Sequence, residues 1–255
     1  MISKGFELDD SMVSTFADTG FLLVREMFNR DEMASITRWT DEVMAMPEVP
    51  GQHMAYYEDH LRDAGRRVLS RIENFCPYHV EFDALLRAGV MSRCVGQLFG
   101  EAAVLFKEKI NFKMPGSDGF KAHQDVQAGW DTYAPLHITL LLSIDDATPE
   151  NGCLELAPGQ HQRGLLGPLW EPLPDPLDGV EYEACPTAVG DAVFFDSFIP
   201  HRSFPNTTQA PRRVLYITYN GASHGDHREQ YYADKRVNFP PDCEREPGRQ
   251  YAFKV

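Results

Sequence analysis

The tripeptide His123-Gln124-Asp125 constrains the fold of this chain more than any other feature of its sequence. Side chains of an extended chain alternate between two faces, so His123 and Asp125 point the same way. An imidazole and a carboxylate on one face can occupy two adjacent positions around a metal ion. A third ligand must then come from a distant segment, and the best candidate is His201. The fold is therefore expected to bring these two segments together.

Two histidines and one carboxylate on one side of an octahedral ion leave three positions open, which is the arrangement of non-haem Fe(II) oxygenases. The His-x-Asp tripeptide alone arises often by chance, and a histidine hydrogen-bonded to the nearby aspartate would also explain it. Arg212 favours the metal interpretation, because it precedes the apolar run 214–219. A guanidinium fixed at the start of a buried strand needs an anion, which a dicarboxylate cosubstrate would supply. A structural ion pair with one of the many acidic residues is the alternative.

The charge balance narrows the class of partner. Acidic residues number 38 and basic residues 24, for a formal net charge of −14. Such a chain lacks the basic footprint that nucleic acid or an anionic membrane requires, so we expect a small-molecule substrate. An anionic substrate is still possible if basic residues cluster locally at the binding site. The sequence does not indicate the oligomeric state.

The sequence also predicts a cytoplasmic location. Its first residues lack the apolar core of a signal peptide, and no apolar stretch reaches the ~18 residues of a membrane span. The 5 cysteines are odd in number and show no Cys-x-x-Cys spacing, which is typical of proteins that keep their thiols reduced.

The first hundred residues are expected to be mostly helical. Helices are predicted over residues 10–16, 30–46, 81–88 and 90–99, and strands over 21–24 and 66–74. Residues 50–66 are polar and irregular, which favours a loop or lid. On the strand over 66–74, Arg67 and Arg71 share a parity and could face a cavity, where they would favour an anionic substrate. A solvated edge strand with surface charges is the simpler alternative.

From residue 104 onward the pattern is that of β-strands separated by Gly and Pro turns. Strands are predicted over 104–113, 136–144, 153–156, 192–196 and 212–219, a long excursion over 165–182, and a helix over 224–236. The strand over 136–144 has one wholly apolar face and one mixed face, as in a barrel wall that separates a core from a cavity. The chain is thus predicted to be mainly β with flanking helices, around a double-stranded β-helix (jelly roll, cupin-like) core.

A single domain over residues 1–255 is expected. Residues 1–100 would brace the barrel, residues 101–222 would form the jelly-roll core, and residues 223–255 would add a C-terminal helix and tail. No repeat, low-complexity segment or clear internal boundary argues for a second domain.

Candidate substrate contacts surround the predicted ligands. Lys109 and Asn111 share a face of the strand that precedes the ligand segment, and are the first candidates for polar contacts. Gln127 and Trp130 lie just past Asp125 and could form part of the wall of the substrate-binding site. His137 is expected to face the cavity, although a hydrogen-bonded core histidine is the more common situation for such a residue.

Several motifs occur together in this chain: His123-Gln124-Asp125, residues 151–154 and 158–161, His201-Arg202-Ser203, and Pro211-Arg212. This combination resembles the phytanoyl-CoA dioxygenase family of Fe(II)- and 2-oxoglutarate-dependent oxygenases, over roughly residues 15–235. The resemblance implies that His123, Asp125 and His201 bind Fe(II) and that the enzyme consumes O2. It further implies that Arg212 holds the distal carboxylate of 2-oxoglutarate. By the resemblance Ser203 would assist in binding this carboxylate, although a simple hydroxyl at a strand end would also explain it. Asn111 is a further candidate for binding the cosubstrate.

The resemblance also indicates a reaction. Halogenating relatives replace the carboxylate ligand by a small residue, whereas Asp125 is present here, which favours hydroxylation. The chain shows no obvious basic surface for a CoA nucleotide, and looks more like bacterial small-molecule hydroxylases of the family, including those acting on 2-aminoethylphosphonate or compatible solutes. We therefore expect hydroxylation of an unactivated C–H bond of a small polar or anionic molecule, with release of succinate and CO2.

Two other classes of function compete with this interpretation. One is a non-catalytic jelly-roll binding protein with a vestigial metal site, against which the complete ligand set argues. The other is a zinc hydrolase that uses the same His and Asp residues. A hydrolase would need a nearby general base and would have no use for Arg212.

Overall fold

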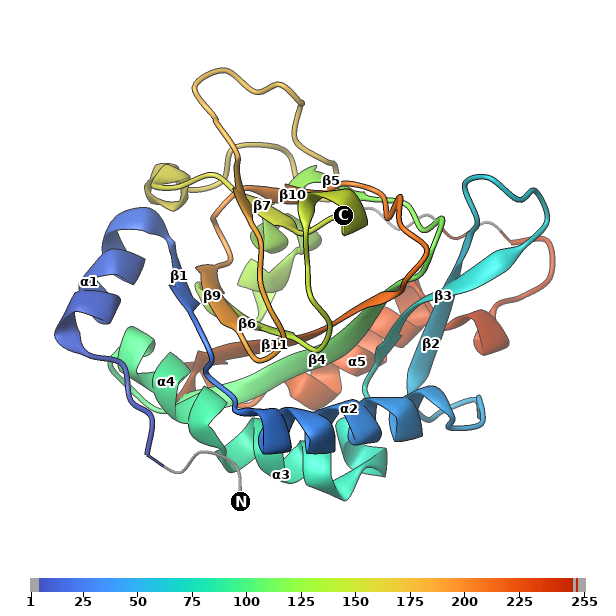
Figure 1. Ribbon diagram of the computed structural model, residues 1–255, viewed down its shortest axis with the longest axis horizontal. Coiled ribbons are helices and arrows are strands. Elements are labelled where there is room, and N and C mark those ends of the chain that lie inside the picture. The colour runs from blue at the N-terminus through green and yellow to red at the C-terminus, as the bar shows by residue number, and fades with distance from the viewer. Residues whose placement is uncertain (1–4, 250, 252–255) are drawn as a thin grey trace.

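The computed structural model describes residues 5–249 and 251 (Figure 1). The strands of this part of the chain are β1 (Phe21–Val24), β2 (Met54–Asp59), β3 (Arg67–Glu73), β4 (Ala103–Lys113), β5 (Phe120–His123), β6 (His137–Ser143), β7 (Leu154–Leu156), β8 (Glu183–Cys185), β9 (Ala192–Asp196), β10 (His201–Ser203) and β11 (Arg212–Gly221). The α-helices are α1 (Asp10–Thr19), α2 (Arg30–Met44), α3 (Val80–Ala88), α4 (Val90–Phe99) and α5 (Arg228–Asn238).

The described strands form two antiparallel sheets. A 7-stranded sheet has the order β1-β9-β6-β11-β4-β3-β2, and a 4-stranded sheet has the order β5-β10-β7-β8. Figure 1 shows the small sheet above the long strands β4, β6 and β11 of the large sheet. Leu141 of β6 packs between the sheets with Leu154 and Leu156 of β7. This arrangement confirms the predicted jelly-roll core.

The helices α2, α3 and α4 cover the other face of the large sheet (Figure 1). Their apolar stripes bury Ile36, Leu86 and Val95, which join one core with Leu140 of β6 and Ile217 of β11. Burial of one such aliphatic side chain stabilises the fold by about 1.5–3 kcal/mol. No helix among the described residues is long and apolar enough to cross a membrane. The cysteines at all five positions are free thiols.

Strand β4 separates the apolar core from a charged interior. Ile110 and Phe112 point to the helices and join the main core. The alternate residues point between the sheets, where Lys109 and Asn111 line a cavity. The strand pairs with β11 on one side and with β3 on the other. The predicted alternation of β4 is therefore confirmed from Lys107 to Lys113, and it places basic side chains inside the barrel. A bulge at Phe106 breaks it, so this ring packs with Trp130 and Tyr231 and not with Ile110 and Phe112 as predicted.

Three predictions about the chain outside the barrel core need correction. Residues 50–66 are only partly a loop, because Met54–Asp59 form β2, which pairs with β3 from Met54↔Glu73 to Asp59↔Arg67. The N-terminal part does more than brace the barrel, since β1, β2 and β3 complete both edges of the large sheet. The C-terminal helix begins at Arg228, after a 3-10 turn over Ala222–His224. In each case the observed structure depends on strand pairing or on a turn at a glycine, and the polar composition of the segment alone did not predict it.

A candidate metal and cosubstrate site

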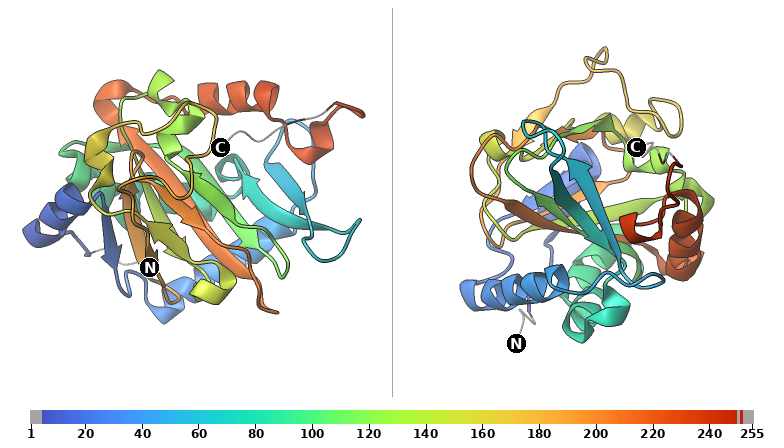
Figure 2. Two further views of the ribbon diagram at one scale, coloured as in Figure 1. Left: turned by 90° about the horizontal axis from the view of Figure 1, so that it is seen from above. Right: turned by 90° about the vertical axis from the view of Figure 1, so that its right-hand side faces the viewer.

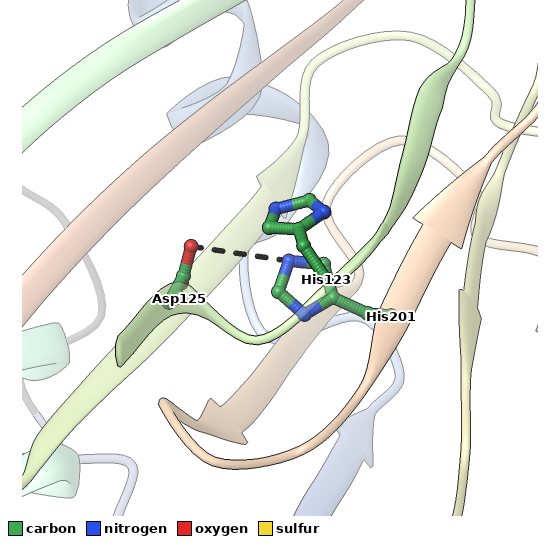
Figure 3. A group of neighbouring side chains, drawn as sticks. All are labelled: His123, Asp125 and His201. Carbon is green, nitrogen blue, oxygen red and sulfur yellow. Dashed lines mark ion pairs between the residues drawn. The ribbon is translucent and has the colours of Figure 1, made fainter. Parts of the chain in front are cut away.

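The ladder between β5 and β10 brings the two predicted histidine ligands together. His201 pairs directly with His123, and their ring centroids lie 4.2 Å apart. Asp125 follows β5 and starts a short 3-10 turn, with its Oδ1 atom 3.9 Å from Nε2 of His201. One ligand atom from each of the three residues lies within 4.8 Å of the others (Figure 3). The predicted ligand set thus converges on one point.

Backbone carbonyls fix the tautomers of both histidines. Nδ1 of His123 lies 2.7 Å from the carbonyl of Lys121, and Nδ1 of His201 lies 3.1 Å from the carbonyl of Ile199. A carbonyl oxygen only accepts, so each Nδ1 carries the proton and each Nε2 keeps a free lone pair. Burial lowers the pKa of His201 and lowers that of His123 to about 3. Both imidazoles are therefore in the neutral form that binds metal ions.

Asp125 is held as an oriented carboxylate. Burial opposes its ionisation, but His201 and Lys109 outweigh that effect and lower the pKa of Asp125. Its Oδ2 atom accepts from the hydroxyl of Thr139 at 3.3 Å, and Thr139 is in turn 2.9 Å from the hydroxyl of Thr218. Two neutral imidazoles and one carboxylate form a donor set that suits Fe(II) and leaves open coordination positions.

Two cavities meet at the predicted ligands. An inner cavity of about 30 Å³ lies between the sheets and an outer cavity of about 420 Å³ opens toward solvent. Both are lined by Phe120 and His123. The inner cavity also contacts Lys109, Asn111, Trp130 and Ser203. The outer cavity also contacts Tyr56, Ser70, Arg71, Phe239, Arg245 and Tyr251. A metal ion at this point would face a cosubstrate on one side and a substrate on the other.

Arg212 is a buried cation for which the structure provides no acidic partner. Its side chain is 2% exposed, and it pairs across the ladder with Lys113, which is also basic. Among the described residues it forms no ion pair, and its Nε atom has no hydrogen-bond acceptor. A buried guanidinium without a counter-ion is strongly unfavourable. Arg212 is therefore suited to bind an added anion. The alternative, a structural ion pair with an acidic residue, is not found among the described residues.

Ser203 is arranged to donate its hydroxyl proton into the inner cavity. Its Oγ atom accepts from Nζ of Lys113 at 2.8 Å and from the backbone N–H of Phe120 at 3.4 Å. Two donors directed at this oxygen leave the Ser203 proton free to donate elsewhere. Asn111 presents an Oδ1 atom with no partner among the described residues. A hydroxyl donor near a buried guanidinium fits the carboxylates of 2-oxoglutarate.

The predicted substrate contacts divide into two groups. Lys109 and Trp130 line the inner cavity. Gln127 lines neither cavity, because its amide is used inside the protein. Its Oε1 atom accepts from the backbone of Gln124 at 2.8 Å, and its Nε2 atom donates to the carbonyls of Pro168 and Glu171. Gln127 therefore anchors the excursion over 165–182 rather than facing a substrate.

Arg67 does not share a face with Arg71, contrary to the prediction. On β2, Tyr56 pairs with Arg71 and the next residue pairs with Leu69, so Ser70 is an extra residue in β3. This bulge reverses the alternation between the two arginines. Ser70 and Arg71 both line the outer cavity, whereas Leu69 packs on the helical core. Arg67 is exposed and forms an ion pair with Asp242 at 2.5 Å.

His137 is buried but lines neither cavity. Its ring packs against Phe106 and Trp130, with centroids 4.4 and 5.5 Å away. Burial lowers its pKa to about 3, so the ring is neutral. Its Nε2 atom has no hydrogen-bond partner among the described residues. His137 therefore packs behind Trp130, inside the wall of the inner cavity, and does not reach the cavity surface.

The sequence did not point to the contribution of the C-terminal region to the site. Lys235 of α5 forms an ion pair with Glu73 of β3 at 2.5 Å. Phe239 stacks on Tyr56, and both line the outer cavity with Tyr251. In the sequence, only the alternation of Arg71 and Glu73 along β3 indicated a charged inner face. The contacts with α5 depend on tertiary packing and have no sequence pattern of their own.

Comparison with known proteins decides the family. The family described as "Phytanoyl-CoA dioxygenase (PhyH)" matches residues 16–214. This chain belongs to the phytanoyl-CoA dioxygenase family. It is 42% identical to "Methylphosphonate hydroxylase" of Gimesia maris, over 91% of this chain and 88% of that protein. It is 40% identical to "2-aminoethylphosphonate dioxygenase" of an uncultured bacterium, HF130_AEPn_1, over 92% and 90% of the two chains.

Solved structures share the fold of this family member. EctD from S. alaskensis with 2-oxoglutarate and 5-hydroxyectoine superposes with a TM-score of 0.70 at 18% identity, over 87% of this chain and 79% of that chain. The carbocyclase SnoK from nogalamycin biosynthesis gives a TM-score of 0.69 at 20% identity, over 84% and 85%. The predicted family and fold are confirmed, and the chain is an Fe(II)- and 2-oxoglutarate-dependent dioxygenase. A non-catalytic binding protein is not favoured.

Proposed function

We propose that this dioxygenase hydroxylates a C–H bond of a small organophosphonate. Substrate, 2-oxoglutarate and O2 would give the hydroxylated product, succinate and CO2, with one oxygen atom entering the product and the other entering succinate. The observation that carries the proposal is the convergence of His123, Asp125 and His201 within 4.8 Å at the junction of two cavities. The substrate class is supported by the names of the two relatives at 42% and 40% identity.

The residues of this chain would divide the work as follows. His123, Asp125 and His201 would hold one face of Fe(II), which supplies O2 activation coupled to the oxidative decarboxylation of 2-oxoglutarate. Arg212 and Ser203 would bind the distal carboxylate of the cosubstrate inside the barrel. The buried, largely dry interior strengthens these charge-assisted hydrogen bonds and excludes water from the reaction.

The outer cavity suits a small anionic substrate. Its volume of about 420 Å³ lies in the range of small-molecule sites. In its lining the basic residues Arg71, Lys121 and Arg245 outnumber the acidic residues Glu58 and Asp118. Tyr56 and Phe239 supply an aromatic wall. Arg71 lies over the ring of Tyr56, with its Cζ atom 4.3 Å from the ring centroid. These side chains would attract a phosphonate toward His123.

The same observations support finer proposals about the whole chain. The large sheet joins β1, β2 and β3 to the strands of the barrel core, which supports one domain over residues 1–255. The free thiols support a cytoplasmic location. The net charge of −14 supports a small molecule rather than nucleic acid as the partner.

The test is substrate-stimulated succinate release by the Fe(II)-loaded enzyme. Methylphosphonate, 2-aminoethylphosphonate, glycine betaine and ectoine are supplied separately with 2-oxoglutarate and O2. We expect a phosphonate to raise succinate release well above the substrate-free rate and to yield one hydroxylated product per succinate. Stimulation by betaine or ectoine but by neither phosphonate would overturn the assignment of substrate class.

A further inference from the structure

A buried carboxylate, Glu73, lies among cationic side chains beside the predicted metal site. Its Oε1 atom is 2.7 Å from Nε of Arg71, and its Oε2 atom is 2.5 Å from Nζ of Lys235 and 4.0 Å from Nζ of Lys107. The Glu73 side chain is 1% exposed and the side chain of Lys107 is 7% exposed. Arg71 and Lys235 already satisfy both oxygens of Glu73 with short contacts, so Lys107 is left with only a distant, shared partner.

A second ammonium group lies next to Lys107. Lys109 pairs with Glu73 across the ladder between β4 and β3, and its Nζ atom lies over the ring of Tyr216. Among the described residues, neither Lys107 nor Lys109 has a hydrogen-bond acceptor for its ammonium group. Nζ of Lys107 rests instead 5.0 and 5.2 Å from the ring centroids of Trp130 and Tyr231. Two neighbouring ammonium groups therefore stand above aromatic rings without an anion between them.

Burial and repulsion from neighbouring cations lower the pKa values of these lysines, and Glu73 and Asp125 offset these effects only in part. Burial, with Lys107 as a neighbour, lowers the pKa of Lys109 to about 8. Burial also lowers the pKa of Lys235 well below its usual value, despite the contact with Glu73. Arg71, Lys107, Lys109 and Lys235 outnumber the carboxylates Glu73 and Asp125 that act on them. Buried cations in excess are unfavourable, so a bound dianion would stabilise this cluster.

The cluster lies where a substrate would meet the metal. Arg71 lines the outer cavity, Lys109 lines the inner one, and His123 lines both. Lys107 lines neither cavity, and its Nζ atom lies against Trp130, a residue of the inner-cavity wall. Asp125 is close enough to Lys109 and Lys107 that both help to lower its pKa. Figure 2 shows α5, which carries Lys235, beside the β2–β3 hairpin, so elements from both ends of the chain enclose this point.

We propose that Lys107, Lys109 and Arg71 form the subsite that binds the phosphonate group of the substrate, with Glu73 and Lys235 as positioning residues. This inference rests on the proposed phosphonate hydroxylation, and it assigns the anionic end of the substrate to β3 and β4. Arg71 would offer its planar guanidinium to two phosphonate oxygens, while the ammonium groups of Lys107 and Lys109 would each donate to a remaining oxygen. Glu73 holds Arg71 and Lys235 in place through the two contacts described above.

The experiment compares Lys107→Met with the matched control Arg67→Met. Both substitutions remove one positive charge from neighbouring strands, but Arg67 is exposed and paired with Asp242, whereas Lys107 is buried beside Glu73. Methylphosphonate is titrated by calorimetry into the Fe(II)- and 2-oxoglutarate-loaded protein without O2, and KM values for methylphosphonate and 2-oxoglutarate are measured with O2. Lys107→Met is expected to raise Kd and KM for methylphosphonate roughly 10- to 100-fold, with the KM for 2-oxoglutarate unchanged within about twofold. Arg67→Met is expected to change neither ligand's affinity.

A second readout does not depend on turnover. Removing Lys107 relieves like-charge repulsion in the empty cluster, so Lys107→Met should melt at a higher temperature than the wild-type protein in the absence of ligand. Added methylphosphonate should then raise the melting temperature of the wild-type protein more than that of the variant. Glu73→Gln should release Arg71 and Lys235 and raise the KM for methylphosphonate while leaving the KM for 2-oxoglutarate unchanged.

The outcomes separate this inference from the proposed reaction. If Lys107→Met binds methylphosphonate as tightly as the wild-type protein, or loses affinity for 2-oxoglutarate by the same factor, the subsite is wrong even where phosphonate hydroxylation is observed. If the wild-type protein binds methylphosphonate through Lys107 but no phosphonate stimulates succinate release, the reaction is wrong and the anion subsite stands. If the wild-type protein binds neither methylphosphonate nor 2-aminoethylphosphonate, both are overturned.

Discussion

His123 and His201 are direct partners in the antiparallel ladder between β5 and β10, with ring centroids 4.2 Å apart. Neighbouring strands lie about 4.8 Å apart, so the ladder itself sets the spacing of the two predicted metal ligands. The carbonyls of Lys121 and Ile199 then fix both rings in the same tautomer. Backbone hydrogen bonds therefore hold both imidazoles in the orientation that the predicted metal site requires.

Thr139 is expected to tune metal affinity through Asp125. Thr139→Val removes the hydrogen bond that orients the Asp125 carboxylate and keeps a side chain of similar volume. We expect Fe(II) affinity to fall roughly 10- to 100-fold, as for other residues that orient metal ligands. Anaerobic Fe(II) titration measures this effect. Thr37→Val on the remote helix α2 is the control, and an equal loss there would contradict the assignment.

Arg212 is expected to act on 2-oxoglutarate alone. Arg212→Met should raise the KM for 2-oxoglutarate roughly 10- to 100-fold, because hydrogen bonds to charged groups contribute about 1.5–3 kcal/mol. The adjacent Arg213 provides the control, since its guanidinium pairs with Asp145 and Asp41 outside the site. Arg213→Met should leave that KM unchanged. Steady-state kinetics with 2-oxoglutarate as the varied component distinguishes the two variants.

Lys113 is expected to make stability depend on pH. Burial and the neighbouring Arg212 lower its pKa from 10.5 to about 7 in the folded protein. Between these values the unfolded chain retains a proton that the folded chain has lost, so the free energy of unfolding rises with pH. The slope from this group is at most about 1.4 kcal/mol per pH unit. Urea unfolding from pH 6 to 9.5 should show this rise in the wild-type protein and a smaller rise in Lys113→Met. Parallel curves would refute the shift.

The ion pair between Arg228 and Glu108 is expected to stabilise the C-terminal helix. Nη2 of Arg228 lies 2.6 Å from Oε1 of Glu108, and both side chains are buried. Arg228→Met leaves a buried carboxylate without its cation and should lower the free energy of unfolding by about 3–5 kcal/mol. Arg87→Met removes an exposed pair with Asp83 and should change it by less than about 1 kcal/mol. Urea unfolding that shows equal effects would contradict this role.

Sequence reasoning located the barrel strands because they follow from local patterns, and the three predicted ligands converge in the structure. The alternation in β4 placed Lys109 and Asn111 on one face, and the apolar run after Arg212 located β11. The pairing of β5 with β10 was not visible in the sequence, but the chemical requirement for a third ligand pointed to His201. The roles of the individual site residues remain predictions.

The misses share one physical cause, which is that they depend on contacts between distant segments. The bulge at Ser70 is a matter of strand pairing with β2, and it moved Arg67 out of the site. Gln127 looked available for a substrate, but the excursion over 165–182 supplies backbone acceptors for its amide. Lys235 could not be linked to Glu73 from sequence, because α5 reaches β3 only in the folded chain.

The most direct test of the central claim is the visible absorption of the protein with Fe(II) and 2-oxoglutarate under anaerobic conditions. Chelation of 2-oxoglutarate to iron held by His123, Asp125 and His201 predicts a weak charge-transfer band in the wild-type protein. The band should be absent in His201→Ala and retained in His224→Ala, whose imidazole lies on the exposed surface. A wild-type protein without the band, or a His201→Ala variant that retains it, would contradict the account.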